Sequence, residues 1–496
     1  MTPPGAGAVP GAGDHAPSPP LWRQLQAAAG VLAAVRAGTS GTAAIEAVPA
    51  ALRPGVQAIA FHALRELGRA EALRRLLARR APPPAADALL CTALALLWNS
   101  AAYEPFTLVD QAVEAAKREP ALRTAAGFLN ACLRRFLRER EALARATDSD
   151  PVAQWNHPLW WIERLQRDHP AGWQDILRAG NVPPPMVLRV NARKATPEQA
   201  LQRLAGAGIA AARVGPMAIA LDRPQPVPAL PGFADGVLSV QDAAAQLAAP
   251  LLLQTLPASA GRPLRVLDAC AAPGGKTAHL LEQCDAALTA LDVDPARCRR
   301  IGENLARLGL QARVVAADAA DPAAWWDGLP FDAVLLDAPC TASGIVRRHP
   351  DVRWLRRPGD VARLAATQRR LLDALWPLLG PHGRLLYCTC SVFRTEGDEV
   401  VQAFLAHNTD AVLHPSPGHL LPQTGANADG LPDNAKRGHD GFFYALLEKS
   451  APPGRSGRAA GVHPAPAGPG AAAGGGAAGA RPEPAARGHR TAGRTQ

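Results

Sequence analysis

The segment LLYCTCSVF, residues 385–393, places Cys388 and Cys390 two positions apart where an apolar run ends. The chain has only 8 cysteines in 496 residues, so this spacing needs a structural or chemical reason. Thiols pack in cores, bind metals, form disulfides or act as nucleophiles. Cys388 lies inside the apolar run and is expected to pack in a sheet, whereas Cys390 lies at the strand end, where a reactive group would be placed.

A third cysteine closes a similar run. The segment FDAVLLDAPC predicts a buried strand that ends at Asp337 and Cys340, and the proline between them fixes the turn. Strands of this kind lie side by side in a parallel sheet, and their carboxyl ends share one edge. Cys340 and Cys390 are therefore expected to reach the same pocket.

Metal binding and disulfides are weaker interpretations of these thiols. A zinc site needs about four cysteine or histidine ligands with close paired spacing, and the CxC motif has no second close pair. Eight scattered cysteines in a long chain are typical of reduced thiols. We expect no bound metal and no disulfide framework.

The segment DACAAPGGKT, residues 268–277, predicts a turn between a strand and a helix whose backbone N–H groups can approach a ligand. It lacks the GxGxxG of dinucleotide sites. Its end, Gly275 to Thr277, matches a phosphate-binding loop whose first glycine is replaced by Cys270. S-adenosylmethionine is the third candidate, because Asp292 and Asp318 end the next two strands and suit ribose hydroxyls and an adenine amine.

Two thiols, an aspartate and S-adenosylmethionine suit one difficult reaction. Carbon five of cytosine is too weak a nucleophile to accept a methyl group unaided. A thiolate that adds to carbon six activates carbon five, which is covalent catalysis. An aspartate can hydrogen-bond the base edge, and a second thiol can assist release of the product.

The pattern of apolar residues predicts several domains. Residues 21–150 read as amphipathic helices, residues 151–255 as a small α+β module, and residues 256–449 as alternating strands and helices, which is typical of a parallel Rossmann-like sheet. Residues 1–20 are rich in proline and glycine, and residues 450–496 are rich in alanine, glycine, proline and arginine. Both ends are expected to be disordered.

The net charge of +10 is unevenly distributed. Residues 21–150 hold 17 basic against 12 acidic side chains, and the basic tail adds a similar excess. This charge is compatible with a polyanionic partner but does not establish one. The sequence has no apolar run long enough for a membrane span and no apolar segment of the export type near its start, so we expect a cytoplasmic protein without membrane contact.

DACAAPGGKT, LLDAPCTASGIVRRHPDVRWLRR and LLYCTCSV together resemble the RNA cytosine-5 methyltransferases with paired Pro-Cys and Thr-Cys motifs. GFLNACLRRFLR and HDGFFYALLEK make the chain similar to the bacterial small-subunit ribosomal RNA methyltransferase B family, over roughly residues 21–449. The resemblance implies a first domain similar to the RNA-binding antitermination factor NusB, a small α+β module and a Rossmann-like methyltransferase domain.

By this resemblance Cys390 is the nucleophile, Cys340 assists product release and Asp337 contacts the base edge or the cofactor. The implied S-adenosylmethionine site comprises Cys270, Ala271, Ala272, Pro273, Gly274, Gly275, Lys276, Asp292, Asp318 and Asp337.

The implied substrate is an unstacked or flipped cytosine of 16S ribosomal RNA, because a stacked base cannot expose carbon six. The arginines that follow the Pro-Cys motif then suggest a phosphate-contacting face, namely Arg347, Arg348, Arg353, Arg356 and Arg357. We expect a monomer. A transfer RNA substrate and, more remotely, a P-loop nucleoside triphosphatase are the alternatives.

Overall fold

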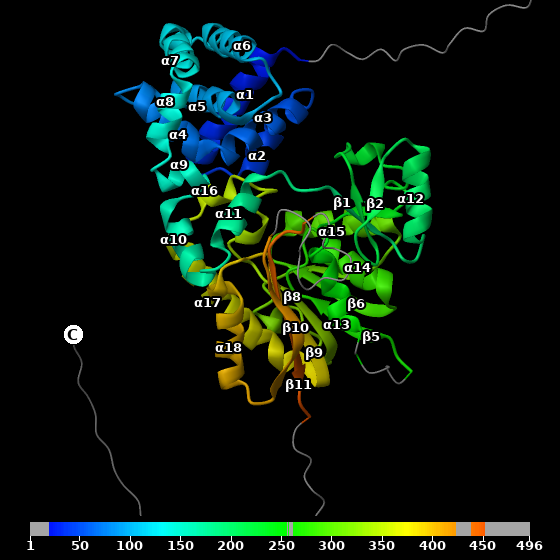
Figure 1. The fold of residues 1–496 in the computed structure, drawn as a ribbon. Helices are drawn as coiled ribbons and strands as arrows, with labels where there is room; N and C mark the ends of the chain where they lie inside the picture. Colours follow the sequence, from blue (N-terminus) through cyan, green and yellow to red (C-terminus); the bar gives the residue numbers. More distant parts are fainter. Residues whose placement is uncertain (1–18, 255, 257–260, 423–437, 452–496) are drawn as a thin grey trace, which may run out of the picture. The chain divides into compact units, whose positions relative to one another are not determined.

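The computed structural model describes residues 19–254, 256, 261–422 and 438–451 (Figure 1). Apart from residues 19–20 and 450–451, the leader and tail that the sequence predicts to be disordered lie outside these ranges.

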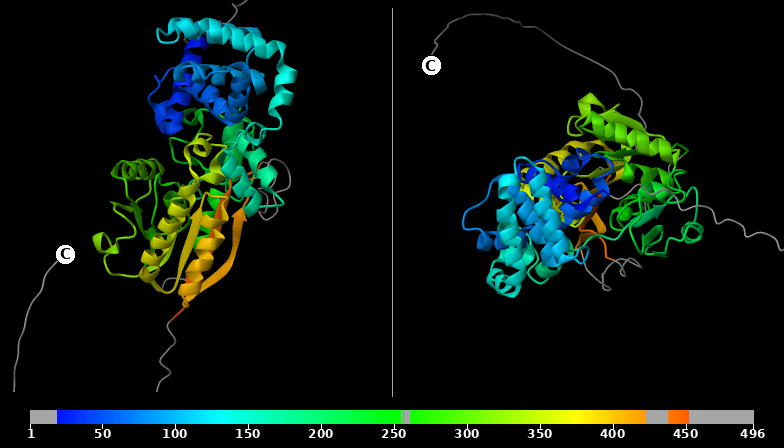
Figure 2. Two further views of the ribbon diagram at one scale, coloured as in Figure 1. Left: turned by 90° about the vertical axis from the view of Figure 1, so that its left-hand side faces the viewer. Right: turned by 90° about the horizontal axis from the view of Figure 1, so that it is seen from above.

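The first part of the chain is a helical bundle, drawn blue to cyan in both views of Figure 2. Its central helix α5 has an apolar sequence on all sides and is buried over almost its whole length, whereas α6 and α7 bury only one face. Ser40 caps α2, and proline stands in the first turn of α3, α5 and α6. The helices are α1 (Leu21–Arg36), α2 (Gly41–Glu46), α3 (Arg53–Arg65), α4 (Leu67–Leu77), α5 (Pro84–Asn99), α6 (Pro105–Arg118), α7 (Ala126–Arg138) and α8 (Arg140–Thr147).

Three helices follow and build a separate aromatic core. Trp161 is fully buried and packs edge to face against Phe393, which comes three residues after Cys390. These helices therefore support the segment that follows the Thr-Cys motif. They are α9 (Pro151–Trp155), α10 (Leu159–Asp168) and α11 (Trp173–Asn181).

A four-stranded antiparallel sheet comes next, with the order β2-β3-β1-β4. Helix α12 begins at a capping box in which Thr196 and Gln199 satisfy each other's backbone N–H groups. The elements are β1 (Val187–Val190), α12 (Pro197–Gly206), β2 (Ala211–Arg213), β3 (Ala218–Leu221) and β4 (Leu238–Val240). This is the small α+β module that the sequence predicts.

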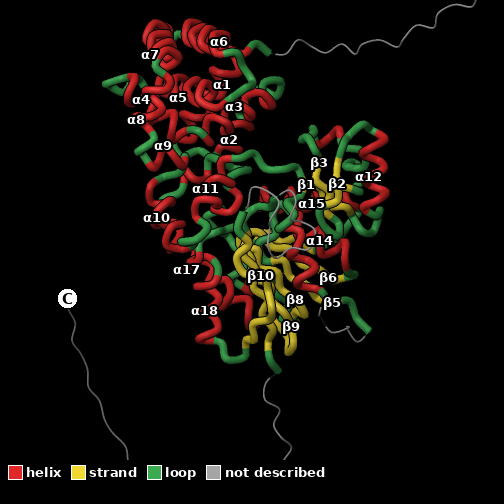
Figure 3. The backbone as a smooth tube through the Cα atoms, in the orientation of Figure 1, coloured by secondary structure: helices red, strands yellow, loops and turns green. Residues whose placement is uncertain are grey.

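The last part contains a seven-stranded sheet with the order β10-β11-β9-β8-β5-β6-β7, seen with the smaller sheet in Figure 3. The strands from β9 to β7 are parallel, whereas β11 runs antiparallel to β9 and β10 antiparallel to β11. Their bounds are β5 (Leu264–Asp268), β6 (Ala286–Asp292), β7 (Arg313–Ala316), β8 (Phe331–Asp337), β9 (Leu379–Thr389), β10 (Ala411–Leu420) and β11 (Phe442–Lys449).

Helices cover both faces of this sheet, and each face has its own core. Helices α13, α14 and α15 pack on one face, and α17 and α18 pack on the other. Near-continuous burial explains the apolar strand sequences. The helices are α13 (Ala248–Leu253), α14 (Gly275–Gln283), α15 (Pro295–Leu308), α16 (Val352–Leu355), α17 (Pro358–Leu375) and α18 (Asp398–His407).

The predicted fold class is confirmed: helical domain, α+β module and Rossmann-like domain follow in that order. The sheet differs from the fully parallel one that the strand and helix alternation predicts. The apolar segment of β11 lies between β9 and β10, so it is shielded by strands on both edges and extends the sheet in the antiparallel sense. Within the described residues, no helix is long and apolar enough to cross a membrane.

Candidate active site

A cavity of about 340 Å³ lies at the carboxyl edge of the parallel strands. The residues after β5, β6, β7, β8 and β9 all contribute to its wall, as expected for an open α/β sheet. The lining includes Cys270, Ala272, Asp292, Val293, Asp318, Asp337, Cys340 and Cys390. The sheet thus brings most of the predicted site residues to one place.

The two predicted catalytic cysteines lie side by side. Because β8 and β9 pair in parallel, with Asp337 opposite Cys388, the turns that follow them meet, and the sulfur atoms of Cys340 and Cys390 are 3.3 Å apart. Both side chains are partly exposed in the cavity. The hydrogen bond to Cys390 and burial raise the pKa of Cys340 well above its usual value, so Cys340 is a thiol at neutral pH.

Asp337 is held by two neighbours. Lys276 Nζ lies 2.7 Å from Asp337 Oδ2, and the Cys388 thiol lies 3.4 Å from Asp337 Oδ1. Burial lowers the pKa of Lys276, but the charge and hydrogen bond of Asp337, together with Cys388 and Cys390, raise it above its usual value, so the lysine remains charged. Cys388 is fully buried in β9, as the sequence predicts, and its contact with Asp337 is an addition to that prediction.

The loop after β5 curls tightly into α14. Gly274 has φ of +94°, and a Cβ there would lie 3.2 Å from Ile301 of α15, so glycine is needed for both conformation and packing. Thr277 Oγ1 donates to Asp268 Oδ2 at 2.7 Å and fixes the strand end below the loop. Cys270 and Ala272 face the cavity, whereas Ala271, Pro273, Gly274, Gly275 and Lys276 are outside its lining.

The far end of the cavity suits a nucleoside. Asp292 accepts the Ala272 N–H at 3.2 Å, so its carboxylate is anchored beside the loop. The next residue, Val293, is 68% exposed within the cavity lining, an apolar surface on which a base can stack. The Ala320 N–H lowers the pKa of Asp318, which stays ionised as an acceptor for an amine. This set of acceptors and apolar surface fits the adenosine of S-adenosylmethionine.

Comparison with known proteins agrees with this geometry. The model of the 16S rRNA methyltransferase RsmB/F family matches residues 258–448, and the ferredoxin-like domain model of RsmF/B-like methyltransferases matches residues 157–228. Ribosomal RNA small subunit methyltransferase B of Pseudomonas syringae pv. tomato is 45% identical over 352 residues, which are 67% of this chain and 75% of that protein. The chain belongs to the RsmB/F family of methyltransferases.

Other relatives support the same membership. The methyltransferase B of Xylella fastidiosa strain Temecula1 is 49% identical over 326 residues, 65% of this chain and 72% of that protein. The crystal structure of PH0851 superposes with a TM-score of 0.67 at 25% identity, covering 86% of this chain and 99% of that chain. A methyltransferase homolog protein from Pyrococcus horikoshii superposes with a TM-score of 0.50 at 28% identity, covering 60% of this chain and 98% of that chain. The P-loop nucleoside triphosphatase alternative is therefore wrong.

In this RsmB/F methyltransferase, two of the five arginines proposed to contact phosphate are buried, so the prediction is wrong for those two. Arg347 is 3% exposed and Arg353 is 0% exposed. Arg347 and Arg348 pair with Asp440 from the segment just before β11. Arg353 Nη2 donates to Gly180 O at 2.6 Å and so caps α11. A basic run in sequence does not show which guanidinium groups satisfy internal carbonyls and carboxylates.

Sequence reasoning missed Glu396. It lies six residues after Cys390 in a polar stretch without any spacing motif, yet it is 0% exposed and contacts residues beside both cysteines. Only its burial, which a sequence pattern does not reveal, distinguishes Glu396 from the less buried Asp398 and Glu399 that follow.

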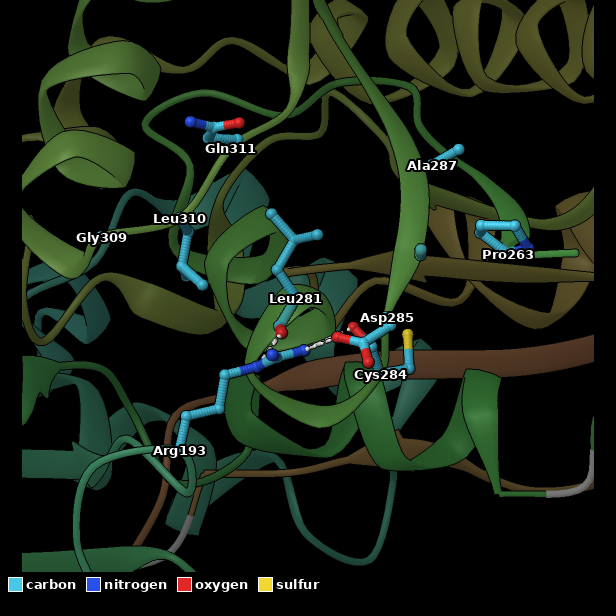
Figure 4. Close-up of a pocket in the computed structure, with 10 residues that line it drawn as sticks. Arg193, Pro263, Leu281, Cys284, Asp285, Ala287, Gly309, Leu310 and Gln311 are labelled. Carbon is cyan, nitrogen blue, oxygen red and sulfur yellow. Dashed lines mark hydrogen bonds and ion pairs between the residues drawn. The ribbon is translucent and has the colours of Figure 1, made fainter.

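A second hollow lies away from this chemistry. Figure 4 shows Arg193 bound to the end of α14 through Leu281 O and to Asp285, at the edge where β5 and β6 begin. This hollow, of about 460 Å³, is larger than the cavity at the cysteines. It lies at the opposite ends of the strands, so we assign it no part in the methyltransferase site.

Proposed function

We propose that the protein methylates carbon five of a cytosine in small-subunit ribosomal RNA, through a transient bond between Cys390 Sγ and carbon six of the base. The observation that supports this most directly is the 3.3 Å approach of Cys340 and Cys390 beside Asp337 in a cavity of a methyltransferase-family protein. Two adjacent thiols are not needed for simple methyl transfer to an oxygen or nitrogen that is already nucleophilic. They suit a reaction in which one sulfur attacks and another helps it leave.

Cys390 is assigned as the nucleophile because it is the cysteine of the Thr-Cys motif, by the resemblance given above. The raised pKa of Cys340 and its 3.3 Å distance from Cys390 suit a thiol that donates its S–H to the neighbouring sulfur. The attacking group must be a thiolate. The lysine at position 276, which stays charged beside Asp337, contributes positive charge to the same region.

The steps balance with these residues. The Cys390 thiolate forms a bond to carbon six, and the displaced electron pair makes carbon five nucleophilic. When bound, S-adenosylmethionine supplies the methyl group that carbon five takes. The proton on carbon five then leaves to solvent, the bond between carbon six and sulfur breaks, and its electron pair returns to Cys390. The Cys340 S–H stabilises that departing sulfur by a hydrogen bond.

Asp337 is proposed to hold the base. Its carboxylate lines the cavity, and Lys276 and Cys388 fix its orientation from below. A fixed acceptor can bind the exocyclic amine, or ring nitrogen three once that nitrogen is protonated in the adduct, and so orients carbon six toward Cys390. The cytosine must be unstacked to enter, because neither carbon is reachable in a helix from inside this cavity.

The cofactor residues follow from the same cavity. Asp292 would accept from the ribose hydroxyls, Val293 would pack on the adenine ring, and Asp318 would accept from its amine. The relatives named as small-subunit ribosomal RNA methyltransferases support the substrate class. A cytosine of transfer RNA stays the alternative substrate.

The test is direct analysis of methylated RNA. Purified protein, S-adenosylmethionine with a labelled methyl group, and 16S ribosomal RNA from a strain lacking this activity are incubated, and the nucleosides are separated by mass spectrometry. We expect labelled 5-methylcytidine. Label in another nucleoside, or only in transfer RNA offered in parallel, would contradict the proposal.

A further inference from the structure

Glu396 is a buried carboxylate next to the cysteine pair. It ends the short 3-10 helix Arg394–Glu396 and is 0% exposed. Its carboxylate oxygens accept the backbone N–H of Thr341 at 2.8 Å, the hydroxyl of Ser391 at 2.7 Å, the hydroxyl of Thr341 and the side-chain amide of Gln368 at 3.3 Å. None of these four donors carries a charge, so burial of this acid is costly.

The partners of Glu396 have one property in common. Thr341 directly follows Cys340, and Ser391 directly follows Cys390. One carboxylate therefore ties together the two turns that carry the sulfur atoms, although these turns are separated by 50 residues in sequence. Gln368 extends the same network, because its side-chain amide also donates to Pro339 O at 2.9 Å, just before Cys340.

The network is closed on its other side. The main-chain oxygen of Glu396 accepts the Tyr387 hydroxyl at 2.8 Å and the Thr389 hydroxyl at 3.2 Å, so β9 holds the residue in place. Burial raises the pKa of Glu396, and the hydrogen bonds from Thr341 and Ser391 oppose that shift. All four groups that contact the carboxylate donate hydrogen bonds to it, which suits an ionised acceptor.

We propose that Glu396 is a positioning residue that holds Cys340 and Cys390 at the separation required for attack and release. The inference rests on the proposed function for its catalytic consequence, but the separation of the thiols is a property of the free protein. Without the carboxylate, two backbone turns lose their shared anchor, and the sulfur atoms are no longer confined to hydrogen-bond distance.

The experiment measures that separation with dibromobimane, a reagent that links two nearby thiols, on the full chain without RNA. Mass spectrometry of peptides identifies the Cys340–Cys390 product. We expect Glu396→Ala to form it at least fivefold more slowly than the wild type. Glu396→Gln should form it at near the wild-type rate, because its oxygen accepts from Thr341 N while its NH₂ donates to the two hydroxyls, which can rotate. The matched control is Glu399→Gln, an exposed acid three residues later.

Turnover is measured on the same variants. Glu396→Ala should lose about 100-fold, with Glu396→Gln restored to within about tenfold of the wild type. If Glu396→Ala does not fold, Glu396→Asp replaces it, since its shorter side chain cannot reach both turns. Unchanged linking in a folded Glu396→Ala or Glu396→Asp variant overturns the inference. If Glu396→Ala links its thiols more slowly than the wild type, but the wild type itself makes no 5-methylcytidine, the inference about Glu396 stands and the proposed function is rejected.

Discussion

The sulfur atoms of Cys340 and Cys390 lie 3.3 Å apart although the residues are 50 positions apart in sequence. The pairing of β8 with β9 creates this approach, and Cys388, the nearer neighbour of Cys390 in sequence, instead turns toward Asp337. The CxC motif therefore contains two cysteines in different surroundings, one buried against Asp337 and one in the cavity lining. The reactive pair that we propose is formed by the fold.

Asp337→Asn should reduce turnover about 100-fold while cofactor binding changes little. In the wild type, Lys276 Nζ lies 2.7 Å from the Asp337 carboxylate. The neutral amide of the substituted side chain cannot form this ion pair, and it is a weaker hydrogen-bond acceptor for the base. Turnover and cofactor affinity are measured on the same preparation. Asp332→Asn, at the other end of β8, is the matched control. Equal turnover in both variants would remove Asp337 from the mechanism.

Asp292→Asn should weaken S-adenosylmethionine binding about 10-fold to 100-fold, because a charged acceptor for the ribose is lost. Isothermal titration calorimetry on the protein without RNA gives the dissociation constant. Asp285→Asn changes an exposed aspartate at the opposite edge of the sheet and should leave the constant unaltered. A twofold effect or less at Asp292 would place the ribose elsewhere.

Asp268 should make stability depend on pH. Burial, opposed by the hydrogen bond from Thr277, raises its pKa to about 7 from 3.8. The folded state therefore binds a proton more tightly than the unfolded chain, and this contribution is lost as pH rises from about 4 to about 7. Relative to Asp268→Asn, the wild type should lose up to about 4 kcal/mol of unfolding free energy over this window.

Denaturant unfolding of both proteins at several pH values, without cofactor, measures that difference. A difference that stays constant, or that grows in favour of the wild type as pH rises, would show that Asp268 is not held protonated in the folded state.

Arg353→Ala should destabilise the fold rather than weaken RNA binding. The side chain is 0% exposed, and its guanidinium donates to the backbone oxygens of Asn156 and Gly180. Loss of these bonds and the cavity left behind should cost about 3 kcal/mol. The exposed Arg357→Ala serves as control and should cost less than about 1 kcal/mol. If Arg353→Ala changed the salt dependence of RNA binding and left the stability unchanged, Arg353 would contact RNA phosphates and the structural role assigned to it would be wrong.

The fold and much of the site were predictable because their signals are local. Apolar runs that end in Asp268, Asp292 and Asp337 mark parallel strands, and the carboxyl ends of such strands share one edge. The antiparallel position of β11 was not predictable, since an apolar strand has the same composition in either direction. The burial of individual polar side chains was also not predictable from the sequence. The basic run after Cys340 and the acid at Glu396 look exposed in sequence, and only the fold shows that Arg347, Arg353 and Glu396 are internal.

The central claim is tested most directly by trapping the protein–RNA intermediate. Cys340→Ala should still attack the base but release it poorly, so a covalent complex should accumulate on a denaturing gel. Cys390→Ala should give neither complex nor methylation. Digestion of the trapped complex and mass spectrometry should place the nucleotide on Cys390. A nucleotide attached to Cys340 in the Cys390→Ala protein, or no complex in Cys340→Ala despite active methylation, would contradict the assignment of the two thiols.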